Sequence, residues 1–260
     1  MNYDETDLAQ RYDIARQMPE HTMRLWLDSI SQYVMLGQDH VVLDVGCGTG
    51  RFSLALAHKF DSHVIGIDPS ETMLSKARSA LTHAKVSFRH GRAEQLPVDD
   101  ASVDLVFLSM VYHHINGQVV AAQEFNRVLR PDGFLCIRNS TLDLLHTVSY
   151  LKYFPEAVEF NRKRMPTQKE IVSTTCANGF YLIKHNVIEQ QFADSLDEYC
   201  EKIGNRGLSD LEALTDAEFK AGMRRIRKAV LKNEESGPII ELIDLFVFKK
   251  KPNQAMQRIA

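Results

Sequence analysis

Val41-Val-Leu-Asp-Val-Gly-Cys-Gly-Thr-Gly50 joins a run of β-branched residues to three closely spaced glycines. The first five residues predict a buried strand, and the next segment, Arg51–Phe60, has the apolar spacing of a helix. Glycines between a strand and a helix let the backbone turn sharply and let a ligand come close to it. The sequence therefore predicts a ligand-binding loop at the carboxyl end of a strand; a plain tight turn is the alternative.

The alternation of strands and helices continues along the chain. Helices are expected at 70–81 and 119–129, and a turn is expected at Arg130-Pro-Asp-Gly133. Six further strands are expected at 63–68, 85–90, 103–110, 134–139, 181–192 and 239–248. Because strands that alternate with helices form parallel sheets, we expect an α/β fold with a doubly wound, seven-stranded, mostly parallel sheet and helices on both faces.

Three helical segments lie outside this alternation, and we expect them to belong to one domain that spans 1–260. Residues 1–38 are expected to form an N-terminal helical lid, 39–140 the ligand-binding core, and 141–178 and 193–237 two helical insertions. Capping boxes, in which a Ser or Thr precedes a Glu by three residues, mark helix starts in the insertions. The boxes are Thr167/Glu170, Ser195/Glu198, Ser209/Glu212 and Thr215/Glu218.

The composition of the 260 residues excludes several classes of protein. Apolar residues make up 44% and charged residues 25%, the proportions of a globular protein with a large core. The net charge of −3 argues against a general nucleic-acid binder, because such proteins usually carry a basic excess. The four cysteines lack zinc-site spacing, so we expect free thiols in a cytoplasmic protein and no metal ion. The longest apolar stretch, 103–112, is too short to span a membrane, and the acidic, polar start is unlike a secretory signal.

Two acidic residues indicate which ligand the glycine loop binds. Asp68 ends the second expected strand, where a carboxylate accepts hydrogen bonds from both hydroxyls of a ribose. Asp44 lies just before the loop, where its charge attracts an ammonium group and repels a pyrophosphate. A dinucleotide site has its third glycine one position later, where Arg51 stands, and the loop lacks the Gly-Lys-Ser/Thr ending of a P-loop. An NAD-linked oxidoreductase is therefore the disfavoured alternative.

Five runs in the core occur in an order that points to one family. They are Leu43-Asp-Val-Gly-Cys-Gly-Thr-Gly50, Gly66-Ile-Asp-Pro-Ser-Glu-Thr-Met73, Gly91-Arg-Ala-Glu-Gln-Leu-Pro97, Ser102-Val-Asp-Leu-Val106 and Arg127-Val-Leu-Arg-Pro-Asp-Gly133. In these runs the chain resembles the class I S-adenosylmethionine-dependent methyltransferases, specifically the group like the ubiquinone/menaquinone-pathway C-methyltransferases. The resemblance is close over about residues 41–139 and loose in the flanks. It implies a Rossmann-like methyltransferase fold, a methyltransferase activity and S-adenosyl-L-methionine as the cofactor.

The resemblance also implies a role for each matching residue of the site. Asp44 and the backbone of Gly46 and Gly48 would hold the methionine part of the cofactor, and Asp68 would hold its ribose. Ser109 would lie under the sulfonium end.

The adenine and the lid have residues of their own in this resemblance. Pro69 and Met73 would pack on the adenine, and the backbone around Ala93 would meet its edge. The family often has an acid where this chain has Arg92, and an arginine cannot accept the hydrogen bond of the adenine amino group. Either Glu94 takes that place or the backbone alone reads the edge.

The segment Arg11-Tyr-Asp-Ile-Ala-Arg16 looks like the lid signature of the family. There Tyr12 would close over the cofactor and Arg16 would approach its carboxylate. An ordinary amphipathic helix is the alternative.

The residues that act on the methyl acceptor are less well marked. His113 and His114 follow the fourth expected strand and are the candidate general bases, because histidine titrates near neutral pH. The alternative is that these histidines pack against or cap the following helix. Tyr112 and His146 are weaker candidates. Arg138 and Asn139 end the fifth strand, where they either orient an acceptor or bond only the backbone.

The segments outside the core are expected to form the acceptor pocket, although aromatic residues at helical spacing are also typical of a core. We expect a small, partly apolar or aromatic acceptor, because such pockets are lined in this way. The basic runs Arg162-Lys-Arg164 and Arg224-Arg-Ile-Arg-Lys228 are expected to be solvated faces, so nucleic acid is not the expected partner. A cofactor-binding partner or sensor protein without turnover is the second hypothesis. The sequence does not predict the atom that is methylated or the oligomeric state.

Overall fold

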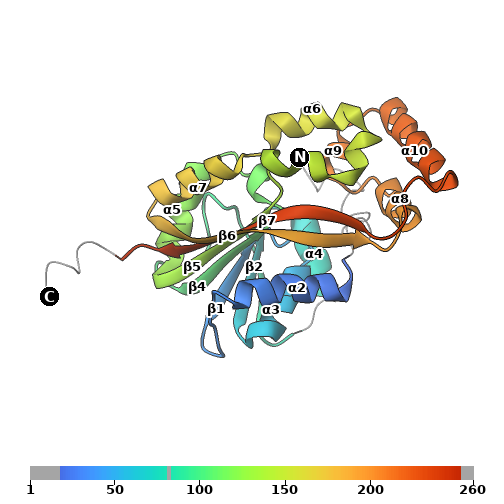
Figure 1. The fold of residues 1–260 in the computed structure, drawn as a ribbon. Helices are drawn as coiled ribbons and strands as arrows, with labels where there is room; N and C mark the ends of the chain where they lie inside the picture. Colours follow the sequence, from blue (N-terminus) through green and yellow to red (C-terminus); the bar gives the residue numbers. More distant parts are fainter. Residues whose placement is uncertain (1–17, 81–82, 253–260) are drawn as a thin grey trace, which may run out of the picture. The chain divides into compact units, whose positions relative to one another are not determined.

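The computed structural model describes residues 18–80 and 83–252, which contain a seven-stranded sheet (Figure 1). Its strands are β1 (Val41–Val45), β2 (His63–Asp68), β3 (Val86–His90), β4 (Val103–Ser109), β5 (Leu129–Asn139), β6 (Phe180–Ala193) and β7 (Ile239–Lys250). They lie in the order β3-β2-β1-β4-β5-β7-β6. The pairs from β3 to β5 are parallel, and β7 is antiparallel to β5. The predicted seven-stranded, mostly parallel sheet is confirmed.

The helices also follow the predicted alternation. The α-helices are α2 (Glu20–Ser31), α3 (Arg51–Phe60), α4 (Glu71–Ala80), α5 (Gln118–Val128), α6 (Pro155–Arg164), α7 (Gln168–Ala177), α8 (Leu196–Gly204), α9 (Ser209–Glu212) and α10 (Asp216–Leu231). Three 3₁₀ segments, η1 (Tyr112–His114), η2 (Leu142–Thr147) and η3 (Ser149–Lys152), complete the described structure. None of the helices among the described residues is both long enough and apolar enough to cross a membrane.

The chain forms two compact units, which we describe separately. The sheet unit comprises the described residues of 25–139, 167–186 and 244–260, and it contains the predicted core of 39–140 up to Asn139. The helical unit comprises the described residues of 1–24, 140–166 and 187–243. Each unit therefore combines segments that are distant in the sequence.

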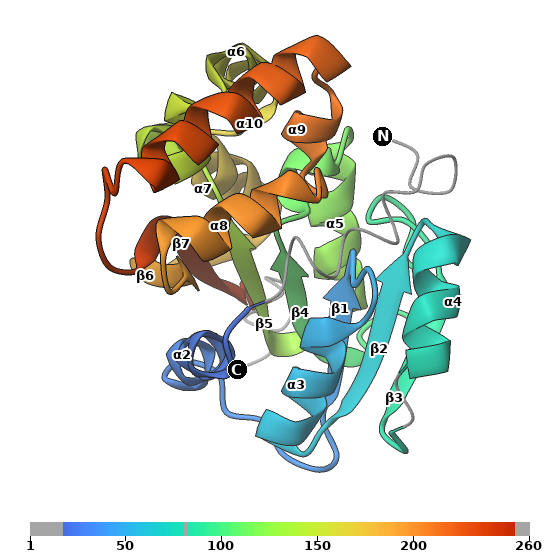
Figure 2. The same ribbon diagram turned by 90° about the vertical axis from the view of Figure 1, so that its right-hand side faces the viewer.

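The sheet unit is built around strands that are buried on both faces. α3 packs against β1 and β2, and α5 contacts β5 and α7. Figure 2 shows α3 in front of the parallel strands and α5 behind them. Strands covered on both faces have nearly continuous apolar runs, as in Val41–Val45, where Asp44 is the exception. A buried carboxylate inside such a run marks a place where stability is not the only requirement.

One predicted turn is wrong in its details. The residues Arg130–Gly133 lie within β5, where the pairing with β4 shifts from Val103↔Leu129 to Leu105↔Phe134. Asp132 adopts the left-handed conformation, with φ 65°. The turn residues are thus accommodated as a bulge, because the strand resumes its pairing with β4 immediately afterwards.

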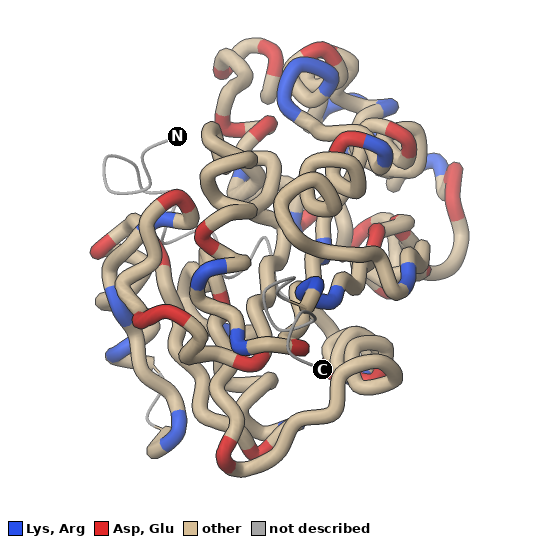
Figure 3. The backbone as a smooth tube through the Cα atoms, turned by 90° about the vertical axis from the view of Figure 1, so that its left-hand side faces the viewer, with Lys and Arg blue, Asp and Glu red and all other residues tan. Residues whose placement is uncertain are grey.

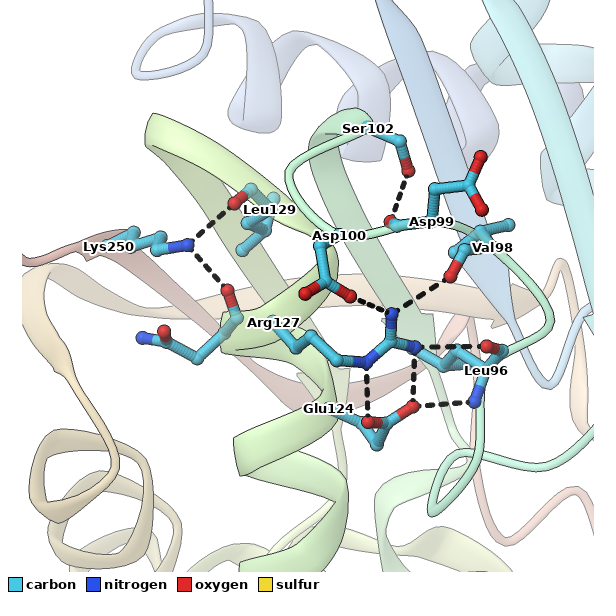
Figure 4. A network of polar contacts seen from close by, with 10 residues as sticks. Leu96, Val98, Asp99, Asp100, Ser102, Glu124, Arg127, Leu129 and Lys250 are labelled. Atoms are coloured by element: carbon cyan, nitrogen blue, oxygen red, sulfur yellow. Dashed lines mark hydrogen bonds and ion pairs between the residues drawn. The ribbon is translucent and has the colours of Figure 1, made fainter.

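An arginine network ties the segment before β4 to α5 (Figure 4). Arg127 makes two hydrogen bonds to Glu124, at 2.7 and 2.8 Å, and one to Asp100 at 2.7 Å. The same guanidinium donates to the carbonyl oxygens of Val98 and Leu96 at 3.0 and 3.1 Å. This planar fork can bond one carboxylate with two parallel hydrogen bonds and still reach other acceptors, a geometry that a lysine ammonium lacks.

The helical unit has its own apolar core. Its larger members are aromatic, namely Tyr150, Tyr153, Phe154, Phe192 and Tyr199, and all five are buried. Of the aromatic residues of 141–160 that were expected to line a pocket, Tyr150, Tyr153 and Phe154 therefore pack inside this unit.

Buried hydrogen bonds hold this core together. The Tyr150 hydroxyl and the Asn161 side-chain amide donate to the Asp210 carboxylate at 2.5 and 2.6 Å, and the Tyr199 hydroxyl donates to Glu241 at 2.9 Å. These bonds satisfy two carboxylates that burial would otherwise penalise.

Helix capping in the insertions follows the predictions at three of the four boxes. Thr167/Glu170 and Thr215/Glu218 form complete capping boxes, and the Ser195 side chain accepts from the Glu198 backbone N–H. The expected box at Ser209 is wrong, because Leu208 is the N-cap residue of α9 and Ser209 is already inside the helix.

The charges of the helical unit are mixed. The basic end of α6 and the basic run in α10 lie near acids: Lys163 pairs with Glu159, and Arg225 with Glu156. Lys and Arg are interspersed with Asp and Glu along the described chain (Figure 3).

Candidate functional site

The glycine loop turns the chain at the carboxyl end of β1. Gly46, Gly48 and Gly50 all have positive φ, at 72°, 56° and 81°, which side chains disfavour. The backbone N–H groups of Gly46 and Cys47 donate to the Ile67 carbonyl of β2, at 2.7 and 3.0 Å. The loop therefore lies against two neighbouring strand ends, next to the point where the strand order reverses between β1 and β4.

Asp44 provides a buried carboxylate beside this loop. Its side chain is 1% exposed, and the Ser53 hydroxyl donates to Oδ2 at 2.7 Å. Burial raises the pKa of Asp44 to about 7; the Ser53 hydrogen bond lowers it in part, and the nearby charge of Asp68 raises it further. The ionised form is thus costly until a cation joins it.

Sequence reasoning missed Ser53. It lies in the first turn of α3, the helix that follows the glycine loop, and only the packing of that helix brings its hydroxyl to β1.

Asp68, the last residue of β2, provides the second acidic side chain beside the loop. Its Oδ2 accepts from the Gly48 N–H at 2.8 Å, and its Oδ1 accepts from the Ser70 N–H at 2.9 Å. Ser70 in turn caps α4, because its hydroxyl accepts from the Met73 N–H at 3.2 Å. A carboxylate can accept about four hydrogen bonds, so these two fix its plane and are compatible with hydroxyl donors as well.

Ser109 and Arg138 lie side by side at the ends of β4 and β5. The two residues are paired in the sheet, and an Arg138 Nη donates to the Ser109 Oγ at 3.0 Å. The guanidinium of Arg138 lies 4.5 Å from the Trp26 ring centre and 5.6 Å from that of Phe52. This buried cation, 3% exposed, is stacked between aromatic rings from α2 and α3.

The two candidate histidines lie together on η1 but differ in their contacts. His113 is buried, and its Nδ1 lies 3.1 Å from the Asn139 Oδ1. The His114 ring packs against the His113 ring at 4.2 Å between centres. The structure thus brings Asn139, which the sequence suggested only for orienting an acceptor, directly to His113.

Comparisons with known proteins identify the family. Residues 43–137 match the model of a methyltransferase domain. A ubiquinone/menaquinone biosynthesis C-methyltransferase of Rubrivivax gelatinosus is 35% identical over 136 residues, which are 52% of this chain and 53% of that protein. A demethylmenaquinone methyltransferase of Staphylococcus aureus is 31% identical over 171 residues, which are 63% of this chain and 70% of that protein. The chain belongs to the class I S-adenosylmethionine-dependent methyltransferases.

Structural likeness to other methyltransferases extends over most of the chain. A putative methyltransferase from an antibiotic biosynthesis pathway of Anabaena variabilis has a TM-score of 0.70 and 23% identity. The match covers 91% of this chain and 99% of that one, and it supports the Rossmann-like methyltransferase fold. The named relatives are methyltransferases, and the cofactor of such enzymes is S-adenosylmethionine. The chain spans about half of the length of the first curated relatives it matches.

The residues expected at the adenine lie beyond the ends of β2 and β3. Met73 and Ala93 are buried, at 2% and 7% exposure, and the Pro69 carbonyl lies 3.0 Å from the His90 Nε2. Glu94 accepts a long hydrogen bond, 3.4 Å, from the Gly117 N–H. The assignment of these residues to an adenine stays a prediction.

Four other residues were named for the site from the sequence. Tyr12 and Arg16 lie outside the described residues. Burial raises the pKa of Tyr112 to about 12, which makes its phenol a poor base near neutral pH. His146 belongs to η2 of the helical unit.

A cavity of about 660 Å³ lies at the end of the sheet where the parallel strands begin, whereas the glycine loop lies where they end. Val41 and Val103, which begin β1 and β4, line it together with Arg127. Because open α/β sheets bind their ligands beyond the carboxyl ends of the strands, this cavity is separate from the site around Asp44.

Proposed function

We propose that this chain transfers the methyl group of S-adenosylmethionine to a small, partly apolar or aromatic acceptor. One observation carries the proposal: Asp44 and Asp68 flank a glycine loop at the ends of adjacent parallel strands. Asp44 is buried and reluctant to ionise alone, so a cationic ligand is its natural partner. A cationic nucleoside amino acid carries both the ammonium and the ribose that such a pair of acids binds.

The roles of the residues follow from their positions. Asp44 would bind the ammonium group, the Gly46 and Gly48 backbone would line the methionine, and Asp68 would accept from the ribose hydroxyls. Pro69, Met73, Ala93 and Glu94 would surround the adenine, and Ser109 would lie near the sulfur. The contacts of Asp68 with Gly48 and Ser70 support this, since they fix the carboxylate before any ligand arrives.

S-adenosylmethionine supplies a methyl group that is already activated by its sulfonium, so the protein mainly has to position the acceptor and exclude water. Orientation alone contributes up to roughly 7–11 kcal/mol in the best cases. A general base adds about 10²–10⁴-fold where the acceptor must lose a proton. His113 and His114 are the candidates for that base.

The names of the relatives support an aromatic ring as the acceptor. Two of them are described as acting in ubiquinone or menaquinone biosynthesis or on demethylmenaquinone. A quinol is partly apolar and aromatic, and it falls in the acceptor class expected from the sequence. We therefore propose a quinol-like or phenolic small molecule.

Calorimetry tests the cofactor part of this proposal. We expect the purified protein to bind S-adenosylmethionine and S-adenosylhomocysteine and not NAD(H). Binding of NAD(H) in place of both would refute the proposal.

Incubation with methyl-labelled S-adenosylmethionine and a short-chain demethylmenaquinol, followed by extraction of the labelled product, tests the transfer. A panel of phenols and catechols extends the search. Cofactor binding without transfer to any of these acceptors would favour a cofactor-binding partner or sensor protein.

A further inference from the structure

A row of polar side chains crosses the sheet unit beyond the predicted cofactor residues. His113 contacts Asn139 of β5, and Asn139 is paired with Asp244 of β7 in the antiparallel register. The Asp244 Oδ1 lies 2.6 Å from the His185 Nε2 of β6 and accepts from the Gln168 amide of α7 at 2.9 Å. Asp244 and Asn139 are both 0% exposed. The row therefore includes side chains of the protein core.

The neighbours of Asn139 determine how its amide is oriented. Directly opposed residues of an antiparallel pair project their side chains from the same face, about 4.5–5.5 Å apart at Cβ. On one side of Asn139 is the Asp244 carboxylate, which only accepts hydrogen bonds when ionised; on the other is His113. The amide NH₂ is the donor of Asn139, so it is best directed towards the acid. The Oδ1 then faces the His113 Nδ1, from which it lies 3.1 Å away.

This arrangement selects one form of the His113 ring. An amide oxygen cannot donate, so the His113 Nδ1 must carry the hydrogen. In the neutral ring Nε2 then carries no hydrogen and can accept a proton. A histidine free in water favours the other tautomer, with the hydrogen on Nε2. The bond made by one nitrogen sets the state of the other. A ring held in this way has its proton-accepting nitrogen on the edge that points away from Asn139.

We propose that Asn139 is a positioning residue that holds His113 in the Nδ1–H form, so that its Nε2 accepts the proton of a hydroxyl on the acceptor. The proposal rests on the proposed function and deepens it, because it selects His113 over His114 and requires an acceptor with an ionisable hydroxyl, such as a phenol or quinol. For methylation at oxygen, the O–H bond breaks, its proton goes to the His113 Nε2, and the electron pair left on that oxygen forms the new O–C bond to the methyl group. The electron pair of the broken carbon–sulfur bond stays on sulfur.

Nuclear magnetic resonance of the histidine rings tests the positioning without any turnover. The full chain is labelled with ¹⁵N-histidine and studied with S-adenosylhomocysteine at a pH where the rings are neutral. A His113→Gln variant identifies the His113 signals among those of the ten histidines. We expect the Nδ1–H form at His113; hydrogen on Nε2 in the wild-type protein overturns the proposal.

Two variants separate positioning from general structure. Asn139→Leu removes the acceptor with little change in size, and we expect the His113 signals to move to the Nε2–H form. Gln168→Leu removes an amide from the same row without touching His113, and we expect its signals to remain unchanged. Loss of the Nδ1–H form in both variants would contradict a specific role for Asn139. If Asn139→Leu fails to fold, the wild-type spectrum still decides the matter.

Kinetics with a phenolic or quinol acceptor from the screen complete the test. We expect Asn139→Leu to lower kcat by about tenfold or more, within the range of a general base, while the affinity for S-adenosylhomocysteine stays within twofold. An unchanged kcat beside a changed tautomer would refute the role of Nε2 as the base. Absence of any methyl transfer in the wild-type protein would instead count against the proposed function, and the tautomer result would stand by itself.

Discussion

Gly46 of the glycine loop packs so closely against Val111, in the segment after β4, that there is no room for a Cβ atom on Gly46. A Cβ placed on Gly46 would lie 2.4 Å from the Val111 Cγ2, far inside normal contact distance. Gly46 also has a φ of 72°, which a side chain disfavours. The glycine loop and the segment that carries His113 are therefore packed directly on each other.

We expect Gly46→Ala to destabilise the protein by about 1–3 kcal/mol, because strain in φ and the contact with Val111 add to each other. Urea denaturation measures the free energy of unfolding, and calorimetry measures the affinity for S-adenosylhomocysteine, which should fall as well. Gly37→Ala is the matched control: an added Cβ there meets only the His40 ring, at 3.8 Å.

A double variant separates the two causes. Adding Val111→Ala to Gly46→Ala removes the Val111 Cγ2, the nearest atom, although the Val111 Cβ stays 2.9 Å from the added carbon. Measured against Val111→Ala alone, the cost of Gly46→Ala should therefore be smaller than in the wild-type background, and an equal or larger cost would contradict the contribution of the Cγ2 contact.

The pKa of Asp44, about 7, predicts a pH-dependent affinity for the cofactor. An ammonium group pairs with the ionised carboxylate, which is the minor form at pH 6 and the major form at pH 8. The affinity for S-adenosylhomocysteine should therefore rise by about tenfold between these values, in proportion to the ionised fraction. Ser53→Ala removes a hydrogen bond that favours ionisation, so it should move the midpoint to higher pH. A flat pH profile in the wild-type protein would contradict the role of Asp44.

The same carboxylate affects the stability of the ligand-free protein with a definite sign. Its pKa is raised from 3.8 to about 7 on folding, so the stability it contributes is fully present below pH 3.8 and is lost as the pH rises to about 7. We expect Asp44→Asn to raise the melting temperature at pH 8, by about 2–4 °C per kcal/mol regained, and to change it less at pH 5. The same variant should weaken cofactor binding. A lower melting temperature of Asp44→Asn at pH 8 would show that the ionised Asp44 does not destabilise the ligand-free protein.

Asp68 combines a predicted ligand contact with a structural one. Asp68→Ala should weaken binding of S-adenosylhomocysteine by about 1–3 kcal/mol, the scale of a lost hydrogen bond to a charged group. It should also lower the melting temperature, since the Gly48 and Ser70 N–H groups lose their acceptor. Asp99→Ala removes an exposed acid distant in sequence from the glycine loop and serves as the control. An unchanged dissociation constant in Asp68→Ala would remove the ribose assignment.

The bounds of α3 and β2 could be predicted from the sequence without error, because neighbouring residues determine them. The helix starts where the glycine loop ends, and the next strand is a short β-branched run that ends in Asp68. Two complete capping boxes were predictable for the same reason, since Thr167 and Thr215 act on residues only three positions away. Ser209 has the same local pattern, but the chain enters α9 one residue earlier, at Leu208.

The contacts that distinguish the site residues could not be predicted, because they join segments far apart in the sequence. Asn139 lies 26 residues from His113, and Arg138 lies 29 residues from Ser109. Parallel strands bring their carboxyl ends together, which explains why these residues meet, but not which partner each one chooses. The bulge at Arg130–Gly133 also depends on a distant segment. Pairing with β4 on both sides of these residues keeps them within a strand, and the local turn sequence does not reveal this.

Arg127 should make a measurable contribution to the stability of the sheet unit. Its side chain is 31% exposed and that of Glu124 is 18% exposed, so their paired hydrogen bonds are only partly screened by water. We expect Arg127→Leu to cost about 1–3 kcal/mol in urea denaturation, and Arg127→Lys to be intermediate, because an ammonium cannot replace the fork.

The hydrogen bond from Arg127 lowers the pKa of Glu124 below 4.5, so the stability from this pair is present above pH 4.5 and is lost as the pH falls below it. The acid-induced loss of stability should therefore be smaller in Arg127→Leu than in the wild-type protein, and equal losses in the two would show that the network (Figure 4) does not stabilise the fold.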